Sequence, residues 1–443
     1  MTFVRLPTHP LSLPETYTAY AYSYPHKSSY APLNPAIPLA EAWRGEPTSG
    51  LLLYVHLPFC EMRCGFCNLF TQSQPADELV WAYLEGVDRQ SEVIRDVLPP
   101  LSFSQFVLGG GTPTYLTTQQ FARLFEIAKR RFAVDPGQIF SSVETSPATA
   151  TPDRLSLLAE AGIQRLSMGV QSFSPRETSA MGRPQSPEMV ERSLERIREK
   201  RFPCLNVDLI YGAEGQTACS WLDSLHELMQ YSPEEIYLYP LYIRPQTGLA
   251  RTSRSTAASR LELYQLGRDF LLAQGYRQIS MRAFRKSSYF APDAGDYQCQ
   301  TDGTIGLGCG ARSYTSRLHY SSGFAVSQPA IRRLIREWVV QPPEEFAIAR
   351  FGYELNEEER QRRFLLLSLL QCEGFDACEF AARFGFAATD RFPELSWLSE
   401  AGYAVWEGDT LRLTASGVEQ SDAIGPLLYS PAVRDALARF APA

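Results

Sequence analysis

The sequence predicts an α/β protein with an incomplete (β/α) barrel of parallel strands, an N-terminal extended arm and a C-terminal winged-helix-like α+β domain. Three observations lead to this prediction. Apolar, β-prone segments alternate with amphipathic helical stretches from Leu51 onward, as in the βα units of a parallel sheet. The chain has 443 residues, enough for a barrel and a smaller domain. Residues 351–443 combine helices with one hairpin.

The N-terminal part carries no periodic pattern. Residues 1–50 are rich in proline and tyrosine, so we expect an extended arm that keeps its order by packing aromatic side chains. Residues 51–245 are assigned to the partial barrel, whose chemistry would lie at the C-terminal ends of the strands. The six expected strands are 51–57, 103–111, 138–145, 163–170, 203–212 and 234–241. Amphipathic helices are expected between them at 79–98, 119–132 and 187–200.

The last two segments differ from the barrel in pattern. Residues 246–350 are less regular and are assigned to a barrel extension on the substrate side, with a helix at 260–274. Residues 351–443 are assigned to the winged-helix-like domain. An amphipathic helix with an acidic first turn is expected at 355–372, and a hairpin at 403–414.

Composition narrows the class of protein. Hydrophobic residues make up 44% of the chain, so disorder is excluded as its main state. The formal net charge of −7 disfavours a dedicated nucleic-acid binder. No apolar run approaches the ~20 residues that cross a bilayer, and the N-terminus lacks the apolar core of a signal peptide. We therefore expect a cytoplasmic protein without a nucleic-acid partner or a membrane span.

Three of the nine cysteines lie within eight positions, as Cys60-x3-Cys64-x2-Cys67 after the first strand. Three thiolates from one loop can hold three irons of a [4Fe–4S] cluster and leave the fourth iron open. Zinc is the alternative, and it would need a further ligand such as His56. The paired cysteines or Cys/His clusters that are typical of zinc sites are not visible in the sequence.

The segment YVHLPFCEMRCGFCNLF resembles the cluster loop of radical S-adenosylmethionine (SAM) proteins, in particular of the oxygen-independent coproporphyrinogen III oxidase family. Further motifs follow in the family's order: GGGTPTYL, ETSP, RLSMGVQSF, NVDLIYG and GLGCG. The resemblance runs from about Leu51 to the end, where EGFDACEFAARFG and LTASGVEQSDAI are similar to the family's C-terminal domain.

The resemblance implies a radical SAM core in which Cys60, Cys64 and Cys67 bind the cluster. The amino and carboxylate groups of SAM would take the open iron. One electron, from a donor such as flavodoxin or ferredoxin, would cleave SAM to methionine and a 5′-deoxyadenosyl radical. This radical would abstract hydrogen from a small-molecule substrate, which is porphyrin-like in the oxidases. The resemblance assigns no further catalytic residue.

The resemblance also implies a set of SAM contacts. The glycine run lets the backbone approach a ligand because no Cβ intervenes, and an arginine suits a bidentate hold on a carboxylate. The expected contacts are Tyr54, His56, Phe66, Gly109, Gly110, Gly111, Thr112, Glu144, Gln171, Arg183, Asp208 and Ile210. Purely structural roles without a ligand stay open for these residues. The glycines could form a tight turn, Arg183 could lie on the surface, Asp208 could cap a helix, and His56 could be a neutral packed side chain. A second SAM would map to Ile210, Gln298 and Gly303–Gly310.

The sequence departs from the family's pattern at two points. The oxidases carry a fourth cysteine two residues after the third, where this chain has Leu69, which weakens the specific claim of porphyrinogen decarboxylation. The His-Asn-x-x-Tyr stretch of the haem chaperones would fall just after Cys299, where this chain reads QTDGTIG and has no histidine, which disfavours the alternative of a haem-binding chaperone. A methyltransferase or cyclopropanase that uses two SAM molecules is a further alternative. Cations that could meet substrate propionates, or face solvent, are Arg244, Arg282, Arg285, Lys286 and Arg312.

Overall fold

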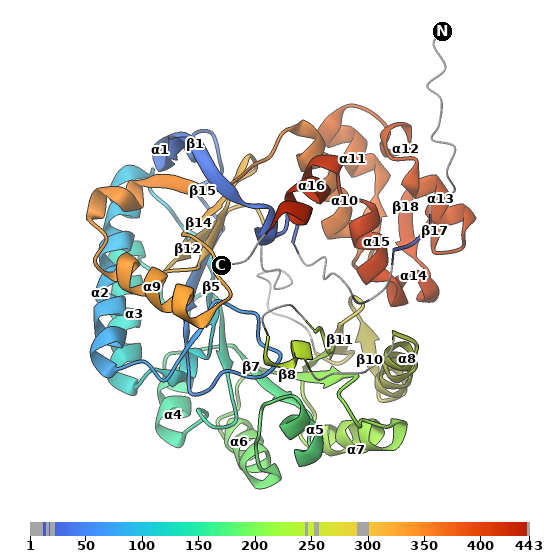
Figure 1. Cartoon of the computed structure of the whole chain (residues 1–443), viewed down its shortest axis with the longest axis horizontal. Helices are drawn as coiled ribbons and strands as arrows, with labels where there is room; N and C mark the ends of the chain where they lie inside the picture. The colour runs from blue at the N-terminus through green and yellow to red at the C-terminus, as the bar shows by residue number, and fades with distance from the viewer. Residues whose placement is uncertain are drawn as a thin grey trace. The chain divides into compact units, whose positions relative to one another are not determined.

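The computed structural model describes residues 12–14, 17, 23–243, 247–251, 257–289 and 301–440. These residues fall into two compact units (Figure 1). The larger unit contains Lys27–Gln278, Arg282–Asn356 and the residues from Ala436 onward. The smaller unit contains Glu357–Asp435, the short segment Ile279–Met281 and the described residues up to His26. In the described part of the chain no helix is long and apolar enough to span a membrane.

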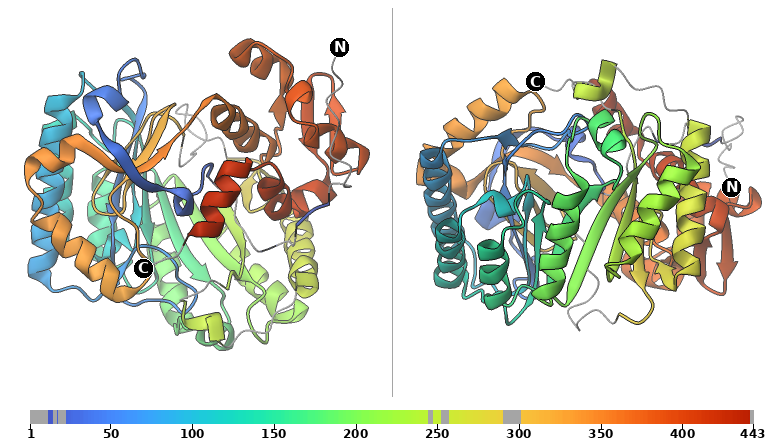
Figure 2. Two further views of the ribbon diagram at one scale, coloured as in Figure 1. Left: turned by 45° about the horizontal axis from the view of Figure 1, so that its top comes forward. Right: turned by 90° about the horizontal axis from the view of Figure 1, so that it is seen from below.

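One sheet of 13 strands organises the larger unit. Its seven central strands run parallel, in the order β12 (Thr304–Leu307), β2 (Leu51–Leu57), β5 (Phe103–Gly110), β6 (Phe140–Thr145), β7 (Arg165–Gln171), β8 (Cys204–Tyr211) and β9 (Glu235–Pro240). The described strands end in β1 on one side and β10 on the other, so the curved sheet is open (Figure 2). The predicted fold class, an incomplete (β/α) barrel, is confirmed.

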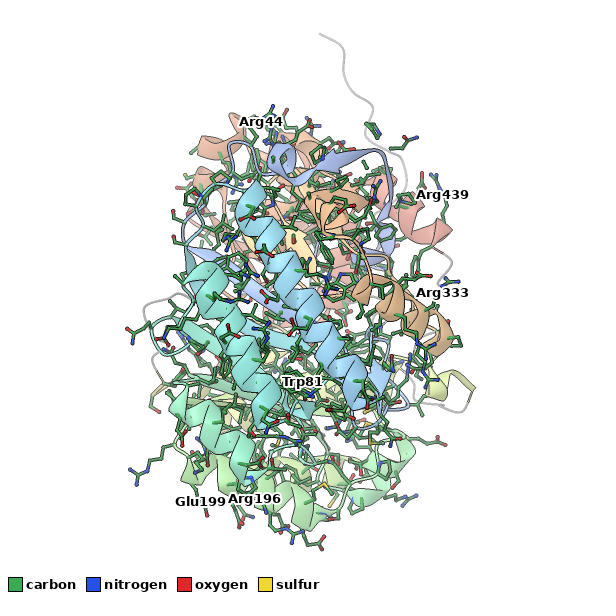
Figure 3. The ribbon with its side chains drawn as sticks, turned by 90° about the vertical axis from the view of Figure 1, so that its left-hand side faces the viewer. Arg44, Trp81, Arg196, Glu199, Arg333 and Arg439 are labelled. Atoms are coloured by element: carbon green, nitrogen blue, oxygen red, sulfur yellow. The ribbon has the colours of Figure 1, made fainter. Side chains whose placement is uncertain are left out.

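All six expected strands form. The helices between Asp77 and Ala273 are α2 (Asp77–Val97), α3 (Thr118–Phe132), α4 (Pro152–Glu160), α5 (Pro175–Ala180), α6 (Pro187–Glu199), α7 (Ala218–Met229) and α8 (Ala257–Ala273). The four expected helices form as α2, α3, α6 and α8, whereas α4, α5 and α7 were not predicted. Capping boxes fix two of the helix starts. Thr117 and Gln120 form a reciprocal capping box at α3, and Thr217 and Ser220 form another at α7. Helices α2 and α3 lie side by side on the outside of the sheet (Figure 3).

The antiparallel strands were not predicted. On the β9 side they are β11 (Ala283–Lys286) and β10 (Tyr276–Gln278), and on the β12 side they are β13 (Arg312–Tyr314), β14 (Leu318–Ser321), β15 (Ile348–Glu354) and β1 (Ala31–Pro38). The arm therefore contributes the edge strand β1, followed by α1 (Leu39–Ala42). Aromatic side chains of the arm pack where the arm is described, since the Tyr30 ring lies 6.3 Å from the Phe351 ring, measured between centroids. Buried Trp43 also donates its indole N–H to the Tyr320 hydroxyl at 2.9 Å.

The smaller unit has helices around a three-stranded sheet. Its elements are α10 (Glu357–Leu369), β16 (Phe375–Asp376), α11 (Ala377–Phe384), α12 (Ala388–Arg391), α13 (Glu394–Glu400), β17 (Ala404–Glu407), β18 (Thr410–Leu413), α14 (Ala415–Glu419), α15 (Ser421–Leu427) and the start of α16 (Pro431–Arg439). The expected hairpin is β17–β18, and Gly408 takes a positive φ of 62° at its turn. Phe364, Phe375 and Phe380 form an edge-to-face core beneath it.

Helix α9 (Gln328–Val339) packs on α2 at a glycine. A Cβ at Gly86 would lie 2.6 Å from the Trp338 ring. The same ring lies 4.8 Å from the Tyr83 ring and 5.5 Å from the Phe346 ring, measured between centroids. Trp338 therefore packs α9 against α2.

We expect Trp338→Ala to lower the free energy of unfolding by about 3–5 kcal/mol, because it leaves a cavity among buried rings. Urea denaturation of the purified protein measures this loss. Trp81→Ala is the matched control, because Trp81 lies on α2 but is only half-buried. Equal losses in the two variants would contradict this packing account.

Candidate functional site

Polar side chains line one face of the parallel strands. On β7, Met168 faces outward, because its sulfur accepts a hydrogen bond from Ser193 of α6. Strand alternation then turns Arg165, Ser167 and Gly169 to the opposite, inner face. The register sets Glu144 beside Ser167, and Asp208 beside Gly169. Carboxylates from β6 and β8 thus meet inside the barrel near the C-terminal ends of the strands.

The cysteine loop follows β3 (Phe59–Cys60), which pairs with β4 (Gln72–Ser73). All three thiols are half-buried and free of disulfides. The Thr112 hydroxyl donates to Cys60 Sγ at 3.5 Å, and an Arg183 Nη donates to Cys64 Sγ at 3.2 Å. Burial raises the pKa of the Cys60 thiol to about 12. Binding a metal cluster would therefore require the loss of a strongly held proton.

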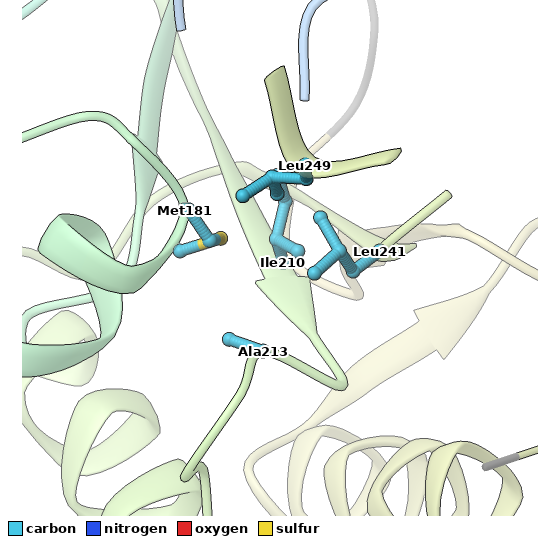
Figure 4. Packing of buried hydrophobic residues seen from close by; sticks show 5 residues of the cluster. All are labelled: Met181, Ile210, Ala213, Leu241 and Leu249. Carbon is cyan, nitrogen blue, oxygen red and sulfur yellow. The ribbon is translucent and has the colours of Figure 1, made fainter. Parts of the chain in front are cut away.

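Close backbone approaches hold the loop in place. The Gly65 N–H donates to Met181 O at 3.1 Å, and Gly65 O accepts from Leu249 N–H at 3.0 Å. A Cβ at Gly65 would lie 2.8 Å from Met181 O, so only glycine fits there without a shift. An apolar cluster continues from this clamp (Figure 4), and it consists of Met181, Ile210, Ala213, Leu241 and Leu249, with Phe66 and Tyr239 packed against it. The structure therefore places Ile210 and Phe66 in one apolar wall beside the cysteine loop.

The glycine run joins the loop to the barrel interior. A Cβ at Gly109 would lie 3.1 Å from the Glu144 carboxylate, and one at Gly111 would lie 2.9 Å from Cys60 Sγ. Gly110 has a φ of 114° and donates its N–H to Glu144 Oε2 at 3.1 Å. Gly109 to Gly111 therefore form a turn that packs closely against Cys60 on one side and against Glu144 on the other.

Two inner carboxyl groups have raised pKa values. Burial and the nearby Asp208 raise the pKa of Glu144 to about 7, although the Gly110 N–H and Arg165 oppose the rise. Burial raises the pKa of Asp208 to about 6, and a hydrogen bond from Asn206 with the charges of Arg165 and Arg183 opposes it. Both groups are ionised above pH 7, where they suit a cationic ligand.

His56 is buried, and burial lowers its pKa to about 4, so the ring is neutral at pH 7. Its Nε2 lies 3.1 Å from Phe70 O, which can only accept, so Nε2 carries the proton. Its Nδ1 then accepts from the Tyr54 hydroxyl at 3.1 Å. The geometry is that of a neutral packed histidine under the glycine run.

Gln171 and Arg183 meet at a strained turn. Gln171 has a φ of 70°, and the β7–β8 register shifts between Gly169 and Gln171. Such positive φ values in non-glycine residues concentrate at functional sites. Arg183 donates to Gly169 O at 2.7 Å as well as to Cys64 Sγ, so its guanidinium bridges the strand end and the cysteine loop.

Most of the cations that could meet substrate propionates contact other side chains of the protein. Arg285 and Arg165 bind the two oxygens of buried Glu235 at 3.0 and 2.8 Å, at the N-terminal starts of the strands. Lys286 donates to Ser232 at 2.6 Å, and Arg282 donates to the Tyr242 hydroxyl. The Arg312 guanidinium lies 6.0 Å from the Tyr314 ring centroid. Arg244 and Gln298 lie outside the described residues.

Sequence reasoning missed the ion triad Arg165–Glu235–Arg285 and the pair Ser167–Asn206. A signal for both was present. Polar residues recur at every second position in RLSMGVQ of β7 and in NVD of β8, and this period marks one face of a strand.

The donor set fits a cluster of several irons. Three thiols project from one loop, and each would bind a different iron of a [4Fe–4S] cluster. In the described part of the chain, no group of three or more His, Cys, Asp or Glu side chains is arranged to hold a single metal ion. Leu69 adds no ligand to this donor set, and it is exposed, at 46%.

Comparisons with known proteins agree with this geometry. The sequence model of the radical SAM superfamily matches residues 54–228, and that of the HemN C-terminal domain matches residues 355–419. Oxygen-independent coproporphyrinogen III oxidase of Cereibacter sphaeroides is 30% identical over 398 residues, covering 84% of each chain. The heme chaperone HemW of Bacillus subtilis is 27% identical over 376 residues, covering 82% of this chain and 95% of that protein.

The fold agrees as well. Coproporphyrinogen III oxidase (HemN) from Escherichia coli superposes with a TM-score of 0.76 at 24% identity, covering 90% of this chain and 96% of that one. The chain therefore belongs to the radical SAM superfamily, within the family of oxygen-independent coproporphyrinogen III oxidase-like proteins. Proteins of this superfamily use a [4Fe–4S] cluster and SAM, and these are the cofactors of the fold.

We expect Gly65→Ala to lower the iron bound after anaerobic reconstitution to about half or less, because the new methyl group would displace the loop from Met181 O. Iron and sulfide analysis, with circular dichroism as a check on folding, measures the effect. Gly323→Ala is the control, since a Cβ there meets only ordinary contacts at 3.5 Å and beyond. Full iron loading of Gly65→Ala would contradict the clamp.

We expect Glu144→Gln to stabilise the protein at pH 8 by on the order of 2 kcal/mol. The pKa of Glu144 is raised in the folded state, so its ionisation above pH 7 costs stability that an amide avoids. Below pH 4.5 the carboxyl is protonated in both folded and unfolded states, and the gain disappears. Thermal melts at both pH values test this, with exposed Glu214→Gln as control. A gain that is equal at both pH values would refute the assignment.

Proposed function

We propose that the protein is a radical SAM enzyme that acts on a small-molecule substrate, with Cys60, Cys64 and Cys67 as its cluster ligands. One observation carries the proposal. The Cys60 thiol, the glycine run with Thr112 and the half-buried carboxylate of Glu144 form a continuous set of contacts at one end of the barrel, and Cys64 and Cys67 lie on the same loop as Cys60. When bound, the reduced cluster and SAM supply a 5′-deoxyadenosyl radical that abstracts hydrogen from the substrate.

The chain's own residues have separable tasks in this proposal. Thr112 and Arg183 stabilise negative charge on the sulfurs of Cys60 and Cys64 by donating hydrogen bonds. Glu144 on β6 and Asp208 on β8 receive the cationic and hydroxyl groups of SAM. Gly109 to Gly111 let the methionine part approach the backbone, and the Gln171 amide lies next to it.

The apolar wall excludes water from the space beside the cysteine loop. Met181, Ile210 and Leu249 are at most 8% exposed, and Phe66 packs on them. A dry wall beside the cysteine loop protects a reactive radical from side reactions. Phe66 offers a ring for the adenine, and Tyr54 and His56 support the glycine run from below.

A porphyrin-like substrate is the first candidate, because the Cereibacter sphaeroides and Paracoccus denitrificans relatives are named coproporphyrinogen III oxidases. Arg282 and Arg312 are the candidate cations for its carboxylates, whereas Arg285 is bound to Glu235. A flavodoxin or ferredoxin would supply the electron, and the cytoplasm would be the compartment.

Two other functions compete. A haem-carrying role is supported by the similarity to HemW, which spans 95% of the Bacillus subtilis protein. A methyltransferase or cyclopropanase would bind a second SAM, for which Gly303–Gly310 and Ile210 are the candidate positions. The oxidase and the methyltransferase would form different nucleoside products from SAM, and the haem carrier would form none.

Anaerobic reconstitution with SAM, dithionite and coproporphyrinogen III, followed by mass spectrometry, tests the proposal. We expect 5′-deoxyadenosine from the wild type, and less than about 1% of that amount from Cys64→Ala. Exposed Cys219→Ala is the matched control and should keep full turnover. S-adenosylhomocysteine beside 5′-deoxyadenosine would instead select methyl transfer. A Soret band with haem and no nucleoside product would select the carrier and reject the enzyme.

A further inference from the structure

Asn206 is a buried residue of β8 whose side chain lies beside β7. It precedes Asp208 by two positions, so both side chains lie on the inner face of the strand. The Asn206 Nδ2 donates to Ser167 Oγ at 2.7 Å and to Asp208 Oδ1 at 2.8 Å. The backbone register sets Asn206 directly beside Ser167. The side chain is 1% exposed, so its position is fixed by packing on both strands.

The amide orientation follows from its neighbours. Asp208 is a carboxylate that accepts, so the group facing it must be the NH₂ and not the carbonyl. Turning the amide over would set two oxygens against each other. Asn206 Oδ1 then has no hydrogen-bond partner within the described residues. The protein thus leaves a buried carbonyl unpaired, which is costly, in return for the bond to Asp208.

Several charged groups act on Asp208. Arg165 and Arg183 favour its ionised form, whereas Glu235 disfavours it. Glu144 on β6 is the other acidic group, and Asp208 raises its pKa. Asn206 supplies the one hydrogen bond that the Asp208 side chain receives from the described residues. It is therefore the contact that fixes where this carboxylate points.

We propose that Asn206, held by Ser167, is a positioning residue that aims the ionised Asp208 carboxylate at a bound SAM. The inference rests on the proposed function, because it assigns SAM to the site that Asp208 faces. Asn206 does not touch the ligand in this assignment. Ser167 anchors the amide from β7, so that the two strands together hold the carboxylate from β8.

Equilibrium binding of SAM to the reconstituted holoprotein, at pH 6 and pH 8.5, tests the inference with Asn206→Leu. Without the hydrogen bond, the pKa of Asp208 should rise by about one unit. The ratio of wild-type to variant affinity should then be about fivefold larger at pH 6 than at pH 8.5. Ser167→Ala should shift the ratio in the same direction by less, and it keeps the test valid if Asn206→Leu does not fold.

Ser193→Ala is the control, because Ser193 is equally buried but lies on the outer side of β7. A loss of affinity that is the same at both pH values, or no loss, would overturn the inference and reduce Asn206 to a packing residue. A wild type that binds no SAM at either pH would instead overturn the proposed function itself. The two failures are therefore distinguishable.

Discussion

The site depends on the close approach of backbone segments around the cysteine loop. Gly65 allows the loop to contact Met181 O, and Gly111 allows β5 to reach Cys60 Sγ. No larger residue fits either contact without a shift, so the distance between the thiols and the barrel interior is set by main-chain packing. The loop is thereby held by backbone that follows α5 and β5, and Arg183 adds a charged contact to Cys64.

The second constraint is charge inside the barrel. Glu144, Asp208 and Glu235 lie among three guanidiniums, those of Arg165, Arg183 and Arg285. Arg165 and Arg285 both bind Glu235, whereas Glu144 and Asp208 accept hydrogen bonds from the neutral Gly110 N–H and the Asn206 amide. Ionising these two buried carboxyl groups costs stability, and a cationic ligand beside them would offset the cost. The Arg165–Glu235–Arg285 triad lies at the strand starts, whereas Glu144 and Asp208 lie nearer the C-terminal strand ends and the cysteine loop.

Much of this arrangement was predictable from the sequence. The βα rhythm gave the six parallel strands because each buried strand is a separate apolar run, and the cysteine spacing located the loop. The strand β12 was missed since its glycines hide the apolar pattern, and the edge strand β1 because its pairing with β15 is long-range. The triad was missed because an arginine at a strand start resembles a solvated charge until the register sets it beside Glu235.

The central claim is that three protein thiolates leave one iron of the cluster for SAM. Electron paramagnetic resonance of the anaerobically reduced holoprotein, recorded with and without SAM, tests it most directly. We predict a [4Fe–4S]⁺ signal whose g values change on adding SAM, and whose intensity depends on Cys60, Cys64 and Cys67. A reduced cluster whose spectrum is identical with and without SAM, or a protein without iron, would contradict the account.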